Sequence, residues 1–370
     1  MTRVRWFWAG LTTLALAAPA GGQLPSRLEP AQFAALVERL SEPGGFFDTD
    51  NLVSNEDSYL HAVTGLRRLG VRGGVYIGVG PDQNFSYIAA LGPAMAFMVD
   101  IRRDNLLEHL LFKAAFARSR SRVEYLGLLL GRPAPADTAG WGARGLDEVL
   151  RYMSGGPDSA AAQRARRVLR AAIRSFGVPL SGQDLATIGR FHDTFIQRGL
   201  DLRLTTFGRP ERRDYPTYRE LLRQTDLEGR PANFLVRESD FLLVKSLQDR
   251  NLVVPLVGDF AGAHALRALG RYLEERGGLV SAFYTSNVEQ YLMGGGGFEA
   301  FAANLAALPH HQHSVIIRSY FPYGRPHPQA VAGYLSVQLL QRVTDLLADV
   351  RQGGYRGYHD LVTRNVLRPQ

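Results

Sequence analysis

The sequence has 370 residues, of which 45% are hydrophobic and 21% charged, so it can bury a large core and has the composition of a folded globular protein. The formal net charge of +8 comes almost entirely from arginines scattered over helix-like segments; no nucleic-acid-binding motif accompanies them, so no nucleic-acid partner is expected. The absence of cysteine excludes disulfides, thiolate metal sites and cysteine nucleophiles.

Residues 1–20 have the pattern of a signal peptide. Arg3 and Arg5 precede an apolar run over Trp6–Ala18, and Ala18-Pro19-Ala20 places small residues at the cleavage spacing. The run is short for a membrane span, which needs ~20 apolar residues. We therefore expect an exported protein, periplasmic or secreted, with an uncleaved N-terminal membrane anchor as the alternative and no further transmembrane span.

The segment from 21 to 50 is expected to be an N-terminal extension with one short helix. Apolar residues recur at helical spacing over Ala31–Leu40, and Pro43-Gly44-Gly45 ends the pattern. Beyond it, Ser54 or Asn55 is placed to cap a helix that runs to Leu69.

The stretch Val75–Asp100 predicts a strand, a glycine turn, a helix, a second strand and a terminal acid. Gly78 and Gly80 form the turn, where glycine allows backbone angles that other residues resist. Asp100 lies 20 residues after Gly80, the spacing at which an acid accepts hydrogen bonds from ribose hydroxyls. Gln83 takes the place of the third glycine of the dinucleotide fingerprint, which argues against a turn that binds pyrophosphate.

Helix and strand patterns alternate along most of the remaining chain. Helical spacing dominates residues 146–230, which we interpret as an insertion able to cover the site, and a long closing helix is expected over 330–350. Further elements are expected in this order: a helix over Asn105–Ala117, a strand over Leu252–Val257, a helix over Ala261–Arg276, a strand over Leu279–Tyr284, a helix over Gly297–Leu308 and a strand over Ser314–Arg318.

This alternation predicts an α/β fold with a doubly wound, mostly parallel Rossmann-like sheet that is covered on both faces. The α/β domain is expected to span residues 51–350, with the helical insertion at about 146–230 inside it. Residues 351–370 are expected to form a C-terminal tail without assignable chemistry.

Three strings carry a resemblance to a known fold family: Asn55–Tyr59, Gly258–Phe260 and Tyr284–Leu292. Together with the glycine turn, they resemble an uncharacterised bacterial exported family with a core like that of class I S-adenosylmethionine-dependent methyltransferases. The resemblance runs from about Asn51 to Tyr323. It implies a small-molecule nucleoside ligand, S-adenosyl-L-methionine as the cofactor, and Asp100 as the acid at the end of the second strand.

Ligands of open parallel sheets bind at the carboxyl ends of the strands, which supply the candidate site residues. Asp259 and the Ser286-Asn287 pair also lie where a helix N-cap is expected, so helix capping remains an alternative to ligand binding for these residues. Tyr284 and Tyr291 fit either stacking on a base or core packing. The candidates for cofactor binding are Gly78, Gly80, Asp82, Asp100, Asp259, Ser286 and Asn287.

The tract His310-His311-Gln312-His313 has two readings. In a strand, His311 and His313 would share one face, and adjacent imidazoles bind zinc or nickel. No carboxylate–histidine spacing accompanies the tract, which also reads as a loop before a strand. No metal is expected.

No catalytic residue is assigned, because the sequence has neither a Gly-x-Ser-x-Gly elbow nor a Walker phosphate loop. Methyl transfer suits this absence, since alignment and desolvation of donor and acceptor lower its barrier without a covalent catalyst. Export and S-adenosylmethionine fit poorly together, because that cofactor is made in the cytoplasm. The hypotheses are therefore a methyltransferase, a non-catalytic exported binding protein on a methyltransferase-like scaffold, and a structural envelope protein.

Overall fold

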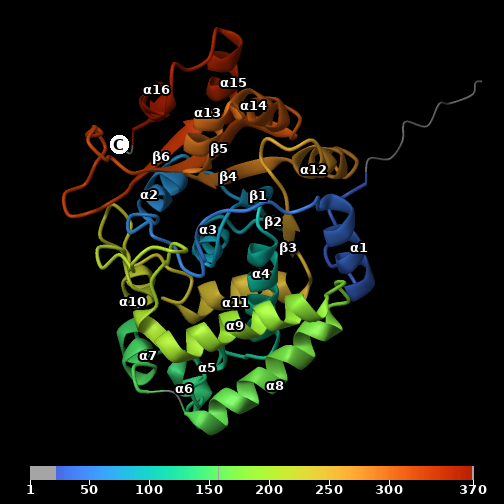
Figure 1. The fold of residues 1–370 in the computed structure, drawn as a ribbon, viewed down its shortest axis with the longest axis vertical. Helices are drawn as coiled ribbons and strands as arrows, with labels where there is room; N and C mark the ends of the chain where they lie inside the picture. The colour runs from blue at the N-terminus through green and yellow to red at the C-terminus, as the bar shows by residue number, and fades with distance from the viewer. Residues whose placement is uncertain (1–21, 157, 369–370) are drawn as a thin grey trace, which may run out of the picture.

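The computed structural model describes residues 22–156 and 158–368 (Figure 1). The signal peptide expected over residues 1–20 lies outside this part of the chain. Among the described residues, no helix combines the length and the apolar character needed to cross a membrane.

The described chain forms one seven-stranded sheet with helices packed on it. The strands are β1 (Val75–Gly78), β2 (Met95–Asp100), β3 (Val253–Val257), β4 (Val280–Ser286), β5 (His310–Tyr320), β6 (Val337–Arg342) and β7 (Val366–Leu367). The longer helices are α1 (Pro30–Leu40), α2 (His61–Arg68), α3 (Gln83–Leu91), α4 (Arg103–Ala117), α5 (Arg122–Leu130), α8 (Ser159–Ser175), α9 (Gly182–Arg198), α11 (Glu238–Asp249), α12 (Ala265–Glu274), α13 (Val288–Gly295), α14 (Phe298–Ala306) and α15 (Val343–Arg351). Short helices complete the set: α6 (Thr138–Trp141), α7 (Leu146–Tyr152), η1 (Gly199–Asp201), α10 (Tyr218–Leu222) and α16 (Tyr358–Thr363).

The strand order is β3-β2-β1-β4-β5-β6-β7, and the first five strands are parallel. β6 is antiparallel to β5, and β7 is antiparallel to β6. The predicted α/β fold with a mostly parallel sheet is thus confirmed. β1, β2 and β3 are buried along their whole length, because helices cover parallel strands on both faces.

The chain reverses its direction of winding between β1 and β4. β1 pairs with β2 on one side and with β4 on the other, so the crossovers leave β1 and β4 toward opposite edges of the sheet. In an open α/β sheet, this point leaves a crevice outside the carboxyl ends of the strands. The candidate residues at the ends of β1, β2, β3 and β4 therefore gather at one edge of the molecule.

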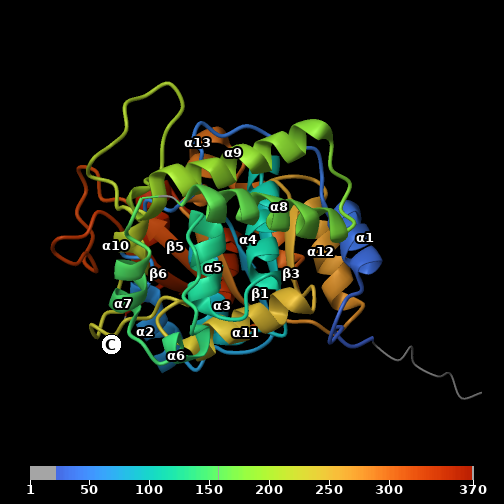
Figure 2. The same ribbon diagram turned by 90° about the horizontal axis from the view of Figure 1, so that it is seen from below.

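The helices of the expected insertion form an outer layer instead of covering the strand ends. α4 packs on β2 and β3, and α8 and α9 lie across α4 and α5 (Figures 1 and 2). Side-chain caps begin both outer helices: Ala161 N donates to Asp158 Oδ1 at 2.7 Å, and Asp184 N donates to Ser181 Oγ at 3.0 Å. The part of the stretch 146–230 that reaches the strand ends is the loop after η1, not a helix.

The prediction of a single helix over 330–350 is wrong for the first half of this range, which contains β6. Backbone pairing runs from Tyr320 opposite Val337 to Val315 opposite Arg342, so this segment satisfies its peptide groups on β5. The strand is buried at five consecutive positions and shows no alternation of apolar and polar residues. A buried run of this kind fits helical spacing equally well, which explains the error.

Two other boundaries differ from the expectation. α2 begins at His61, because the loop before it is held by contacts distant in sequence: Leu335 N and Ser336 N donate to Asp57 at 2.7 and 3.1 Å. Ser54 accepts a hydrogen bond from Glu56 N at 3.0 Å instead of capping a helix. The expected tail over 351–370 contains α16 and β7, and β7 extends the sheet.

A fully buried ion pair fixes α13 to the sheet. Arg318 on β5 donates to Glu289 on α13 through Nε at 2.7 Å and Nη2 at 3.0 Å, and both side chains have no exposed surface. Arg318 Nη1 also donates to Gln341 on β6 at 2.7 Å. Because α13 follows directly on Ser286 and Asn287, this pair holds the end of β4 in place.

Replacing Arg318 by alanine leaves the carboxylate of Glu289 buried without its cation. We expect Arg318→Ala to lower the free energy of unfolding by about 3–5 kcal/mol, measured by urea denaturation. The double variant Arg318→Met/Glu289→Met, which removes both charges, should recover much of that loss. A single variant as stable as the parent protein would contradict this role of the pair.

Candidate functional site

A cavity of about 550 Å³ opens at the carboxyl ends of β1 to β4. Its size is in the range of small-molecule sites. Its walls come from the ends of β1, β2 and β4, the segment after β3, the start of α13, the segment 46–56 and the loop 204–215. Among the predicted site residues, the cavity is lined by Gly80, Asp100, Asp259, Ser286 and Asn287.

The turn after β1 is tied together by the side chain of Asn84. Its Nδ2 donates to the carbonyls of Val79, Gly80 and Pro81 at 2.9, 3.2 and 2.8 Å, and its Oδ1 accepts from Tyr76 at 2.7 Å. Gly78 faces this side chain, since a Cβ there would lie 1.9 Å from Asn84 Oδ1. Gly78 is therefore required for packing and does not line the cavity.

Gly80 is the glycine that meets the cavity. Its φ of +80° is in the left-handed region, and a Cβ there would come within 3.2 Å of Gln83 Nε2. His109 on α4 contacts the Gly80 carbonyl through Nε2 at 2.9 Å. Burial lowers the pKa of His109 to about 4, so the imidazole is neutral and Nε2 carries the proton that it donates.

Asp100 lines the cavity, but its carboxylate is already paired. Arg102 donates to Oδ1 from its backbone N at 2.9 Å and from Nε at 3.1 Å, and to Oδ2 from Nη2 at 2.9 Å. Both side chains are buried. Burial lowers the pKa of Arg102, but the attraction of Asp100 outweighs it and raises the pKa above its ordinary value.

Glu56 is a site residue that sequence reasoning did not single out. Its carboxylate is buried at the cavity wall and accepts hydrogen bonds from the Tyr284 hydroxyl, the Ser286 and Ser319 hydroxyls and Gln338 Nε2. Burial raises the pKa of Glu56, and these four hydrogen bonds act against the rise. Glu56 lies inside one of the three strings quoted above, but its partners lie more than 220 residues away in sequence.

The ends of β3 and β4 complete the inner wall. Ser286 has φ +53°, an uncommon conformation for a residue with a side chain. Asp259 accepts from Ala261 N at 2.9 Å, but it is not the cap of α12. That role falls to Glu42, which accepts from His264 N at 3.1 Å and Ala265 N at 3.3 Å.

Two loops pair with each other over the cavity and form a lid, defined as 46–51 and 204–209. Asp50 N donates to Thr205 O at 3.0 Å, and Phe207 N donates to Asp48 O at 2.8 Å. Arg209 lies 3.5 Å from Asp48, so these two charges offset each other at the mouth. On α13, Tyr291 meets Phe47 edge to face at a centroid distance of 5.0 Å.

Two predicted aromatic or acidic candidates lie away from the cavity. Tyr284 is buried in the core, where its hydroxyl donates to Glu56. Asp82 is also buried and accepts from the Tyr218 hydroxyl at 2.7 Å. Burial raises the pKa of Asp82 to about 6, although the hydrogen bond from Tyr218 opposes the rise.

The histidine tract forms the start of β5. The rings of His311 and His313 lie 5.9 Å apart, but His311 Nδ1 accepts from the backbone N of His313 at 3.0 Å. Within residues 22–156 and 158–368, no cluster of three or more histidine, aspartate or glutamate side chains is arranged to hold a metal ion.

Two buried acceptors at the cavity have no hydrogen-bond partner. They are Gln83 Oε1, on the first turn of α3, and Thr49 Oγ1, in the lid. A buried polar atom without a partner costs free energy, so such atoms mark places where a bound molecule can supply a donor. Both atoms belong to residues that line the cavity.

The family described as "Domain of unknown function (DUF7790)" matches residues 52–136 and 200–366. The chain belongs to this family. The match contains Glu56, Gly80, Asp100, Asp259 and Ser286, and it leaves out residues 137–199, which hold α6 to α9. In this DUF7790 protein, the strand-end cavity is therefore built largely from the family core. No curated protein matches the chain.

The buried carboxyl of Asp82 makes stability depend on pH. The pKa of Asp82 is about 6 in the folded state and has the ordinary value of 3.8 in the unfolded state. The protonated carboxyl therefore makes its full contribution to the free energy of unfolding below pH 3.8, and this contribution is lost as the pH rises through 6. The variant Asp82→Asn cannot ionise, so its free energy of unfolding relative to that of the parent should rise by about 2.4 kcal/mol from pH 4 to pH 7. Urea denaturation across this range measures the difference, and a pH-independent difference would contradict a raised pKa.

Proposed function

We propose that this chain binds a nucleoside-type small molecule in the strand-end cavity, with S-adenosyl-L-methionine as the first candidate. The observation that carries the proposal is the meeting of Gly80, Asp100, Asp259 and Ser286 around one cavity at the point where the strand order reverses. The parallel order β3-β2-β1-β4-β5, followed by an antiparallel strand, supports the resemblance to the methyltransferase core.

The residues present fit such a ligand in part. The glycine turn meets the cavity at Gly80, and the unpaired acceptors Gln83 Oε1 and Thr49 Oγ1 suit the amino and hydroxyl donors of a nucleoside. The apolar and aromatic side chains of Phe47, Val288 and Tyr291 offer surfaces for a base. Oδ2 of Asp100 accepts one hydrogen bond from Arg102 and so retains a lone pair for a ribose hydroxyl, whereas Oδ1 already accepts two.

S-adenosyl-L-methionine, when bound, supplies an activated methyl group. The protein would orient the ligand and exclude water. The lid would shield the cavity from solvent, and the backbone and side chains of Ser286 and Asn287 would orient the ligand. Glu56, with its carboxylate buried among neutral donors, is placed to interact with a polar or positively charged group of ligand or acceptor.

A second candidate is a non-catalytic binding protein on the same scaffold. Two contacts favour it: Asn84 occupies the carbonyls of the glycine turn, and Arg102 occupies the inner face of Asp100. Groups that a nucleoside-binding turn would offer to its ligand are here bonded within the protein. Binding without methyl transfer would also fit the proposed export of the chain to the periplasm or beyond.

Asn287 provides the sharpest test, because it lines the cavity and its side chain does not cap α13. We expect Asn287→Ala to weaken binding of S-adenosyl-L-methionine by about 1 kcal/mol, roughly fivefold, without changing the melting temperature. Calorimetric titration of the parent, this variant and the exposed-surface control Gln352→Ala measures the effect. No binding to the parent would refute the cofactor assignment.

Asp100→Ala is the less informative variant, because the structure shows this carboxylate buried and paired, not free at a strand end. Its removal leaves the buried guanidinium of Arg102 without its carboxylate, so we expect a loss of about 3–5 kcal/mol in unfolding free energy with or without ligand. A melting temperature equal to that of the parent would show that the Asp100–Arg102 pair is not a structural element.

A further inference from the structure

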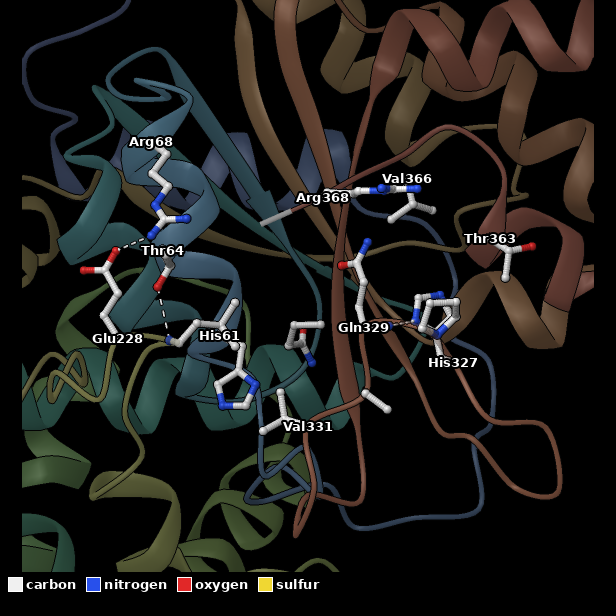
Figure 3. A pocket seen from close by; sticks show the side chains of 14 residues that line it. His61, Thr64, Arg68, Glu228, His327, Gln329, Val331, Thr363, Val366 and Arg368 are labelled. Atoms are coloured by element: carbon white, nitrogen blue, oxygen red, sulfur yellow. Dashed lines mark hydrogen bonds and ion pairs between the residues drawn. The ribbon is translucent and has the colours of Figure 1, made fainter. Parts of the chain in front are cut away.

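A second cavity, of about 760 Å³, lies against β6 and β7 at the edge of the sheet. Its two sides are α2, which carries His61, Thr64 and Arg68, and the segment 327–331, which carries His327 and Gln329 (Figure 3). Apolar residues such as Leu227, Val331 and Val366 complete the walls. We call this cavity the β6 groove. It shares no lining residue with the strand-end cavity.

Gln338 gives the β6 groove an unsatisfied acceptor at its inner wall. The side chain is 7% exposed and lines the groove. Its Nε2 donates to Glu56 Oε2 at 3.1 Å and to the Ser319 hydroxyl, whereas Oε1 is buried without a partner. The reverse orientation of the amide would place its oxygen against Glu56 Oε2, so Nε2 faces Glu56 and Oε1 is the atom left without a partner.

His61 adds a neutral ring to the same wall. Burial lowers its pKa, although Asp57 and Asp226 act against this effect, and the ring meets Tyr334 at a centroid distance of 4.5 Å. A neutral imidazole offers one donor and one acceptor. The inner part of the groove therefore combines apolar surface with hydrogen-bonding groups of both kinds.

The rim of the β6 groove is positively charged. Arg68 and Arg368 are exposed there, and the acid among the lining residues is Glu228. Glu228 is shared: it pairs with Arg68 at 2.8 Å and also with Arg230. Asp226 pairs in turn with Arg67 and Arg230, so with Arg368 there are four guanidinium groups against two carboxylates, which leaves a net positive potential at the entrance.

We propose that the β6 groove binds a small hydroxy acid, whose hydroxyl donates to Gln338 Oε1 and whose carboxylate lies at Arg68 and Arg368. A donor at the inner end satisfies the orphaned carbonyl, and an anion at the outer end matches the rim. This site does not depend on the nucleoside proposal. Because Gln338 also donates to Glu56, one side chain links the two cavities.

Calorimetric titration of the full chain with lactate and with para-hydroxybenzoate, each beside its O-methyl ether, tests the hydroxyl contact. We expect at least one hydroxy acid to bind, and its ether to bind at least about fivefold more weakly, since the ether leaves the carbonyl of Gln338 unpaired. Ethers that bind as well as the parent acids, or no binding of either acid, would overturn the proposal.

Variants locate the binding in the groove. Gln338→Met keeps the length of the side chain and removes the acceptor, so it should reduce the difference between acid and ether to less than about twofold. Arg368→Ala, at an exposed position of the rim, should weaken binding at least about threefold, whereas Arg351→Ala on α15 should not. If Gln338→Met does not fold, the arginine variants decide, and equal affinity of Arg368→Ala and Arg351→Ala would place the ligand elsewhere.

Discussion

The carboxylate of Glu56 is the constraint around which this end of the molecule is arranged. A buried carboxylate must be hydrogen-bonded, and its four partners among the described residues are all neutral groups. These donors belong to β4, β5 and β6, so Glu56 joins the segment before α2 to three neighbouring strands. The strand-end cavity lies on one side of it and the β6 groove, through Gln338, on the other.

Around this centre, the protein satisfies with its own side chains several groups that a nucleoside-binding turn leaves free. Asn84 takes the carbonyls after β1, and Arg102 takes the carboxylate after β2. The groups left for a ligand are shifted toward β4: the Ser286–Asn287 junction, Gln83 Oε1 and the lid. The proposed nucleoside binding should therefore depend more on the β4 side of the cavity than on the acid of the second strand.

The sequence predicted the sheet well where local patterns decide the structure. β1, α3 and β2 follow directly from an apolar run, a glycine turn and a second apolar run, and the parallel order follows from the alternation of helices and strands. β6 was missed because a strand buried on both faces has no two-residue alternation to distinguish it from a helix. The start of α2 was missed because Asp57 is held by Ser336, which is 279 residues away.

The site was predictable only in part, because several of its contacts join residues that are distant in sequence. Strand ends can be located from local patterns, which brought Gly80, Asp100, Asp259, Ser286 and Asn287 to one cavity. The burial of Asp82 under Tyr218 and the convergence of donors on Glu56 depend on tertiary contacts that no spacing shows. The pairing of Asp100 with Arg102 is the exception, since an arginine two residues after an acid is visible in the sequence.

A crystal structure of the protein grown with S-adenosyl-L-methionine is the most direct test of nucleoside binding in the strand-end cavity. We expect electron density for the nucleoside in the strand-end cavity, in contact with Gly80 and Asn287 and beneath the lid formed by 46–51 and 204–209. Density for the ligand in the β6 groove, or an unchanged and empty strand-end cavity at saturating ligand, would contradict it.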